Sequence, residues 1–319
     1  MLDVLDAHSG QSEAFRADVL AGLALPQKAI PSRWLYDDRG SQLFEKITTL
    51  DDYYPTRTET AILQQHAFEM ASICGRSAII LEYGAGAGKK TEILLNALDR
   101  PRLYVPIDIA GDFLKDSAER IDLRFPQIET QPVIADFTKE FELPADLPEG
   151  GRRCGFFPGS TIGNLDRSEA AAFFLRMRRQ VGSTGMAIVG FDLKKDFEVL
   201  RAAYDDREGV TAAFNLNILA RINRELDGDF PIDRFSHLVR WNEAESAIEM
   251  HLRSMDAGEV HVAGQRFAFM AGETIHTESS RKYDLDMIGE TVASWGWEFG
   301  KAWTDDDRLF AVVALNAKR

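Results

Sequence analysis

The sequence of 319 residues contains only two cysteines, Cys74 and Cys154, and six histidines. Two cysteines cannot build a disulfide framework, and no Cys/His spacing is typical of a metal site. We interpret His251 and His261 as ordinary surface or interior histidines. The sequence therefore predicts reduced thiols, a cytoplasmic protein and no bound metal.

Positive charge and long apolar runs are also scarce. Lys and Arg total 37 against 51 Asp and Glu, which gives a formal net charge of −14. Such a chain repels phosphate backbones and anionic lipids, so neither a nucleic acid nor a membrane is an expected partner. No segment is apolar enough to span a bilayer, and residues 1–6 lack the basic start of a signal peptide. Without heptads or a long apolar stripe, we expect a monomer.

What the sequence does contain is a regular alternation of strand-like and helix-like segments between residues 77 and 195. This alternation predicts a parallel sheet with helices on both faces, the doubly wound α/β class. The expected strands are 77–83, 103–108, 131–135, 153–158 and 186–192, and the expected helices are 90–98, 111–122 and 167–181.

The pattern changes after residue 195. Residues 195–225 are predicted to be helical, and 235–278 show short alternating runs typical of an antiparallel sheet. After residue 280 the α/β pattern resumes with a helix at 285–294 and a hairpin of strands at 297–304 and 308–317. We therefore predict a discontinuous core of residues 62–195 and 283–319, and a second, α+β domain of residues 1–61 and 196–282.

A glycine-rich turn, Glu82-Tyr-Gly-Ala-Gly-Ala-Gly-Lys-Lys-Thr91, joins the first strand of the alternation to its helix. Glycines here let a ligand approach the backbone, and the helix N-terminus offers free N–H groups. Dinucleotide and P-loop fingerprints both require glycine where Lys89 stands. The remaining pattern, acidic-x-Gly-x-Gly-x-Gly with Gly84 and Gly86, resembles the S-adenosylmethionine loop of class I methyltransferases. A tight turn without a ligand is the alternative.

Acidic residues end the next two predicted strands. Asp108 follows Gly86 by 22 residues, and in doubly wound folds an acid at this distance accepts hydrogen bonds from ribose hydroxyls. Asp136 is followed by Phe137, a pair that can bond the adenine amino group and stack on the ring. The alternative for Asp136 is a helix cap. Acids at successive strand ends, in order, favour a nucleoside ligand.

Several longer motifs resemble the histidine Nα-methyltransferases of ergothioneine biosynthesis. The resemblance runs in order from about residue 25 to the C-terminus. It is carried by Trp34-Leu-Tyr-Asp-Asp-Arg-Gly-Ser-x-Leu-Phe44, Tyr53-Tyr-Pro-Thr-Arg-Thr-Glu59, Gly159-Ser-Thr-Ile-Gly-Asn-Leu165, Ala213-Phe-Asn-x-Asn217, Asn223-Arg-Glu-Leu226 and Glu278-Ser-Ser280.

The resemblance implies a class I methyltransferase core, a second domain that binds the substrate, and S-adenosylmethionine as the cofactor. It implies transfer of three methyl groups to the α-amine of L-histidine, which gives hercynine. The matching cofactor positions are Gly84, Gly86, Lys90, Asp108, Asp136 and Phe137. The matching substrate positions are Tyr36, Tyr53, Gly159, Asn164, Tyr204, Met250, Glu278, Ser279 and Ser280. The glycine loop departs from relatives in having alanines between its glycines.

Methyl transfer to an amine needs positioning and desolvation, so we expect no catalytic nucleophile. Tyr36, Tyr53 and Asn164 are expected to orient the substrate, and aromatic faces suit a trimethylammonium product. Glu278 is the predicted selector of the imidazole ring; pairing with Arg281 or Lys282 is its alternative role. Asn164 could instead cap the following helix. Methylation of another free aromatic amino acid, or cofactor binding without catalysis, are the competing functions.

Overall fold

The computed structural model describes residues 2–86 and 88–318. Met1, Ala87 and Arg319, which belong to the predicted domain ranges, lie outside the described residues; Ala87 is part of the glycine turn. The chain divides into two compact units. Unit 1 comprises Met1–Tyr53 and Asp196–Ser280, and unit 2 comprises Tyr54–Lys195 and Arg281–Arg319. The assignment of cofactor binding to one part and substrate binding to the other remains a prediction.

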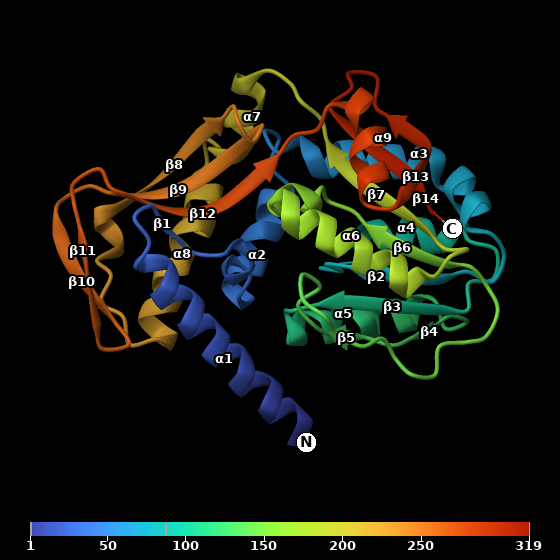
Figure 1. The fold of residues 1–319 in the computed structure, drawn as a ribbon, viewed down its shortest axis with the longest axis horizontal. Helices are drawn as coiled ribbons and strands as arrows, with labels where there is room; N and C mark the ends of the chain where they lie inside the picture. The colour runs from blue at the N-terminus through green and yellow to red at the C-terminus, as the bar shows by residue number, and fades with distance from the viewer. Residues whose placement is uncertain (1, 87, 319) are drawn as a thin grey trace. The chain divides into compact units, whose positions relative to one another are not determined.

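Unit 2 is built on one large sheet with the strand order β13-β14-β7-β6-β2-β3-β4, and β5 also pairs with β3 (Figure 1). Its strands are β2 (Ile79–Tyr83), β3 (Leu103–Asp108), β4 (Glu129–Thr130), β5 (Val133–Ile134), β6 (Arg153–Phe157), β7 (Met186–Asp192), β13 (Trp297–Thr304) and β14 (Phe310–Ala317). Strands β3, β2, β6 and β7 are parallel, whereas β14 is antiparallel to both β7 and β13. The predicted doubly wound sheet with an antiparallel final strand is confirmed.

The order of this sheet reverses at β2, which pairs with β3 on one side and with β6 on the other. In open α/β sheets, ligands bind beyond the carboxyl ends of the strands at such a switch point. The glycine turn begins directly after β2. The fold thus places the turn where a doubly wound sheet binds its ligand.

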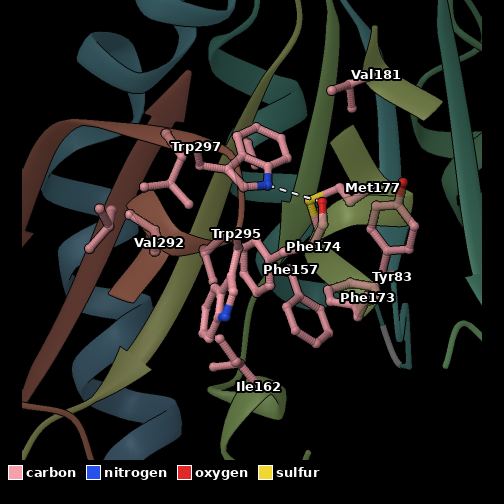
Figure 2. Close-up of a cluster of buried hydrophobic side chains, with 14 of the residues drawn as sticks. Tyr83, Phe157, Ile162, Phe173, Phe174, Met177, Val181, Val292, Trp295 and Trp297 are labelled. Carbon is pink, nitrogen blue, oxygen red and sulfur yellow. Dashed lines mark hydrogen bonds between the residues drawn. The ribbon is translucent and has the colours of Figure 1, made fainter. Parts of the chain in front are cut away.

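Helices cover both faces of the sheet. Successive side chains of a strand point to opposite faces, so the buried strands present apolar side chains on both. Ile79, Leu81 and Tyr83 pack on one face, whereas Ile80 packs on the other. The first face meets α6 (Arg167–Val181) and α9 (Leu285–Ser294), whose aromatic core appears in Figure 2. The second face meets α3 (Tyr54–Cys74), α4 (Lys89–Ala97) and α5 (Gly111–Arg124). Both cysteines, which are free, lie in the core of this second face.

The predicted strand 131–135 is wrong in its extent, because the structure has two short strands, β4 and β5, at this place. Pro132 lies between them and has no N–H to donate to the sheet. The predicted boundary at residue 62 lies inside α3, which runs unbroken from Tyr54.

Unit 1 combines helices with a sheet of order β1-β12-β9-β8 and a separate hairpin of β10 and β11. Its elements are α1 (Leu2–Leu23), β1 (Lys28–Ala29), η1 (Ser32–Leu35), α2 (Asp38–Ile47), α7 (Phe197–Tyr204), α8 (Val210–Glu225), η3 (Ile232–Arg234), β8 (Phe235–Asn242), β9 (Ala247–Ser254), β10 (Gly258–Val262), β11 (Gln265–Phe269) and β12 (Thr274–Arg281). The antiparallel prediction for 235–278 is confirmed for β8 with β9 and for β10 with β11. β1, a two-residue strand that joins β12 in parallel, was not predicted, because it is too short to show a pattern.

Candidate functional site

The glycine turn has the backbone geometry that its sequence predicts. Gly84, Gly86 and Gly88 have φ angles of 71°, 47° and 65°, in the left-handed region that favours glycine. Gly88 is the N-cap residue of α4, so the first N–H groups of that helix lie directly after the turn. A Cβ atom added to Gly84 would lie 3.5 Å from the Phe137 ring. The N–H groups of Gly84, Gly86 and Gly88 donate within the protein and fix the turn, which has an aromatic face beside it.

Glu82, the acidic residue of the motif, is buried and binds within the protein. Its carboxylate accepts hydrogen bonds from the Thr91 and Tyr104 hydroxyls, the first over 2.5 Å. Burial raises the pKa of Glu82 to about 8, although both hydroxyl bonds oppose this shift. Glu82 thus ties β2 to α4 and β3, and holds the two ends of the turn.

Asp108 ends β3 beside the turn. Its carboxylate accepts from the Gly86 N–H at 3.1 Å and from the Ala110 N–H at 3.0 Å. Burial raises the pKa of Asp108, and the N–H groups of Ala110, Gly86 and Ile109 act against that rise. Because a carboxylate has about four acceptor positions, these bonds still leave it capacity for a ribose hydroxyl. The side chain fits the predicted role.

Asp136 and Phe137 follow β5 by two and three residues. Asp136 accepts from both the main-chain N–H and the hydroxyl of Thr138, at 3.0 and 2.5 Å. It closes a turn, and no described helix begins there. The Phe137 ring packs edge-on against Phe157 and Phe173 at centroid distances of 5.5 and 5.4 Å. The core therefore fixes the ring orientation.

Lys90 and Gly159 share one buried partner, Glu59, which is fully shielded from solvent. Lys90 Nζ lies 2.5 Å from Glu59 Oε2, and the Gly159 N–H donates to the two carboxylate oxygens at 3.0 and 2.8 Å. A predicted cofactor residue and a predicted substrate residue are thereby held by the same carboxylate from α3.

Asn164 ends the short 3-10 helix η2 (Thr161–Asn164) in unit 2. The alternative that Asn164 caps the following helix is wrong. Asp166 is the N-cap of α6, and it forms a capping box with Glu169 in which both bonds are 2.8 Å. The predicted substrate role of Asn164 remains a prediction.

The predicted tyrosines of unit 1 form one aromatic cluster. Tyr36 contacts Phe44 and Phe214 with ring centroids 5.4 Å apart in both pairs. Tyr53 lies 6.3 Å from Phe44 and 6.1 Å from Tyr204. Electron-rich ring faces gathered in this way can hold a cationic group. Phe44 and Phe214 were missed, although both belong to the motifs singled out from the sequence.

Tyr204, at the end of α7, is held at both its main chain and its hydroxyl. Tyr204 Oη and Ser280 Oγ are 2.8 Å apart. Its carbonyl lies 2.9 Å from His237 Nε2, and His237 Nδ1 lies 2.9 Å from Asn215 Nδ2. Because the carbonyl must accept and the amide must donate, His237 carries its proton on Nε2. Burial lowers the pKa of His237, which keeps the ring neutral.

The predicted imidazole-binding residues lie on β9 and β12. Met250 is buried, and its carbonyl accepts from the Thr277 hydroxyl at 3.0 Å. Glu278 and Ser280 are buried and share one face of β12, since strand side chains alternate. The Ser279 side chain is only partly buried, and its hydroxyl lies 3.0 Å from His276 Nε2. Lys282, one alternative partner for Glu278, binds Asp192 at 2.8 Å.

Three of the motifs singled out from the sequence meet at Asp37, the N-cap of α2. Its carboxylate accepts from the Gly40 N–H at 2.8 Å and from Asn217 Nδ2 at 2.7 Å, and Arg224 Nη2 lies 2.7 Å away. These bonds tie α2 to α8 and fix the main chain beside Tyr36. These motif residues therefore position α2 and the main chain beside Tyr36, a role that the sequence alone does not show.

Among the described residues, no group of three or more His, Cys, Asp or Glu side chains could hold a metal ion. In the same part of the chain, no helix is both long and apolar enough to cross a membrane. The chemistry available to unit 2 is thus nucleoside binding by main-chain N–H groups, carboxylates and an aromatic ring. Unit 1 offers aromatic faces, hydroxyls and the buried carboxylates of Glu278 and Asp206.

Residues 15–317 match the protein family described as histidine-specific methyltransferase, SAM-dependent. The chain is 41% identical over 310 residues to a histidine N-alpha-methyltransferase of Mycobacterium tuberculosis, covering 96% of this chain and 95% of that protein. It is 39% identical over 304 residues to the enzyme of the same name from Mycolicibacterium smegmatis, covering 94% of each. Among solved structures, an S-adenosylmethionine-dependent methyltransferase from Clostridium acetobutylicum aligns with a TM-score of 0.46 and 9% identity, over 81% of this chain and 92% of that one.

Proposed function

Because the chain belongs to the family of histidine-specific, S-adenosylmethionine-dependent methyltransferases, we propose that it trimethylates the α-amine of L-histidine. The product is hercynine, and the reaction is the first step of ergothioneine biosynthesis. The family match over residues 15–317 carries this proposal. The glycine turn with Asp108 in unit 2, and the aromatic cluster with Glu278 in unit 1, support it.

Six residues of unit 2 would hold the cofactor. When bound, S-adenosylmethionine supplies an electrophilic methyl group on its sulfonium. The turn at Gly84 and Gly86 would admit a ligand close to the main chain, and Asp108, which already holds the Gly86 N–H, would accept a hydrogen bond from a ribose hydroxyl. Asp136 and Phe137 would contact the adenine, and the Lys90 ammonium would bind the cofactor carboxylate.

The chain's own residues orient the amine and exclude water from it. The α-amine must be neutral to attack, so tyrosine hydroxyls and the Asn164 amide suit it better than an added acid. Tyr36, Tyr53 and Tyr204 provide aromatic faces that tolerate the fixed positive charge of a trimethylated product. Gly159 would contact the substrate through its main chain.

Substrate choice would come from the buried face of β12. Glu278 can accept a hydrogen bond from one imidazole nitrogen, while Ser280 bonds the other and Met250 packs beside the ring. Ser279 would contribute through its main chain, since its hydroxyl already contacts His276. A site built for such bonds rejects analogues that lack them by about 10⁴-fold.

The direct test incubates the purified protein with S-adenosylmethionine and each of the twenty amino acids, followed by mass spectrometry. We expect a gain of three methyl groups on histidine alone. Methylation of tryptophan or tyrosine instead would establish the competing substrate, and no methylation of any amino acid, with cofactor still bound, would establish a binding protein. The small-molecule substrate follows from the family; a monomeric state, a cytoplasmic location, and the absence of nucleic-acid or membrane binding remain predictions from the sequence.

A further inference from the structure

A buried carboxylate at the end of β7 joins four other segments of unit 2. Asp192 is 1% exposed. Tyr54 Oη donates to both of its carboxylate oxygens at 2.8 Å, and the ammonium groups of Lys195 and Lys282 lie 2.5 and 2.8 Å from Oδ1 and Oδ2. The Asp192 N–H donates to Ser160 Oγ over 2.9 Å. These five residues are named the Asp192 cluster.

The Asp192 cluster is charged although it is buried. Burial would raise the pKa of Asp192, but Lys282 and Lys195 together hold it below its ordinary value. Burial lowers the pKa of Lys195 to about 8, against the attraction of Asp192. Apolar residues of similar volume often stabilise a fold as well as a buried ion pair does, whereas loss of one partner strands a buried charge. Stability alone is thus a weak reason for this cluster, and a positional role explains it better.

The members of the cluster occupy special places along the chain. The chain passes between the two units after Tyr53, after Lys195 and after Ser280. Tyr54 is the first residue after the first passage, Lys195 is the last before the second, and Lys282 is the second after the third. One carboxylate therefore fixes the unit 2 end of all three passages.

The same members are sequence neighbours of proposed substrate residues. Tyr53 precedes Tyr54, Gly159 precedes Ser160, and Ser280 lies two residues before Lys282. Ser160 has a φ of 55°, a left-handed conformation that costs a non-glycine residue energy and needs support. Adjacent Cα atoms are about 3.8 Å apart, so a shift at an anchored residue moves its neighbour as well.

We propose that Asp192 is a positioning residue for methyl transfer, which fixes the main chain beside Tyr53, Gly159 and Ser280. This inference rests on the proposed function. Cofactor affinity should be largely independent of Asp192, because Gly86, Asp108 and Asp136 are held by other bonds. A merely structural role would instead weaken both affinities along with stability.

The test measures histidine turnover, the calorimetric Kd for S-adenosylhomocysteine, and the Kd for histidine in its presence. For Asp192→Asn we expect the KM and Kd for histidine to rise by about tenfold or more, since small displacements of bound groups are costly. The Kd for S-adenosylhomocysteine should stay within about threefold of the wild-type value, a factor that corresponds to less than 1 kcal/mol.

Three further variants keep the test decisive. Tyr54→Phe removes one hydroxyl and keeps the ring, so it decides the question if Asp192→Asn does not fold. Cys154→Ala is the matched control, because it destabilises the core of unit 2 near the start of β6. Gly159 and Ser160 follow the opposite end of that strand. Lys282→Met added to Asp192→Asn removes one stranded cation and should restore part of the histidine affinity.

Each result has one meaning. A selective loss of histidine affinity in the Asp192 and Tyr54 variants supports the inference. Unchanged histidine affinity in both, or a parallel loss of both affinities in proportion to the loss of Tm, as expected of Cys154→Ala, overturns it. A wild-type protein that leaves histidine unmethylated rejects the proposed function itself, and this inference with it.

Discussion

At the scale of single residues, the proposed site positions differ in how well the sequence predicts them. Glycines and strand-end acids of unit 2 follow a local pattern, so Gly84, Gly86 and Asp108 were predictable from the sequence. Glu59 and His237 were not, because each acts through partners far along the chain: Glu59 binds Gly159, 100 residues away. The available signal was that Glu59 is the last residue of a motif singled out from the sequence, although the sequence alone assigned it no role.

Substrate choice is expected to depend on Glu278. In Glu278→Ala, the imidazole loses its charged partner, so the preference for histidine over tryptophan, as the ratio of kcat/KM values, should fall by at least about tenfold. The measurement is competitive turnover of both amino acids. Glu273→Ala, which removes a partly exposed carboxylate paired with Lys28 just before the same strand, serves as the control. An unchanged ratio in the Glu278 variant would reject this role.

The Tyr204 hydroxyl gives a second test at this scale. Tyr204→Phe removes the 2.8 Å contact with Ser280 and should raise the KM for histidine about threefold to tenfold, the usual worth of one hydrogen bond. Steady-state kinetics measures the change. Tyr83→Phe removes an equally short hydroxyl bond, to Gln180, in the core of unit 2 and should leave KM unchanged. Equal KM values for the two variants would contradict the proposed contact.

At the scale of elements, sequence patterns predicted long strands and helices well and short ones poorly. The central strands of the unit 2 sheet were predictable from their alternation with helices, since β2, β6 and β7 are almost entirely buried. β1 has two residues and no pattern, and β4 and β5 are separated by Pro132. Asp192 ends a predicted strand as Asp108 does, so a fourth strand-end acid was visible in the sequence. Apart from Lys195, three residues away, its partners were not, because Tyr54, Ser160 and Lys282 come from segments distant in sequence.

The turn between β2 and α4 can be tested with two glycines of similar conformation. Gly84 and Gly75 have φ angles of 71° and 83°, so alanine costs about 1 kcal/mol of strain at either position. Gly84→Ala should weaken S-adenosylhomocysteine binding by at least about tenfold, because a ligand approaches its backbone. Gly75→Ala, at the end of α3, should lose stability only. Equal affinities by calorimetry would show that the turn does not bind the cofactor.

Glu82 should give stability a characteristic dependence on pH. Between its ordinary pKa of 4.5 and about 8, folded Glu82 retains a proton that the unfolded chain has released. The free energy of unfolding therefore falls as pH rises through this window. Thr91 and Tyr104 bond the group, and Asp108 and Lys90 are the nearby charges.

Replacing this group with an amide isolates its effect. Between pH 5 and pH 8, the free energy of unfolding of Glu82→Gln should rise relative to that of the wild type by about 2 kcal/mol or more. Urea unfolding measures this difference. Glu140→Gln, at a carboxylate that is 72% exposed, should show no such trend. Parallel pH curves for wild type and Glu82→Gln would mean that Glu82 is ionised in the folded protein.

At the scale of the whole molecule, the fold does not identify the substrate, since one fold hosts many reactions. The doubly wound sheet of unit 2 indicates a nucleoside cofactor. Histidine is instead indicated by motifs of unit 1 and by the family match across residues 15–317. A net charge of −14 is compatible with a small zwitterionic substrate. The atom that receives the methyl groups is therefore the point on which the whole assignment depends.

One measurement tests that point most directly: NMR of the product formed from L-histidine and a methyl donor carrying a ¹³C-labelled methyl group. Trimethylation of the α-nitrogen predicts a single labelled methyl resonance from three equivalent methyl groups, with both imidazole nitrogens unmodified. A labelled methyl group on the imidazole ring, or no transfer of label to histidine at all, would contradict the proposed activity.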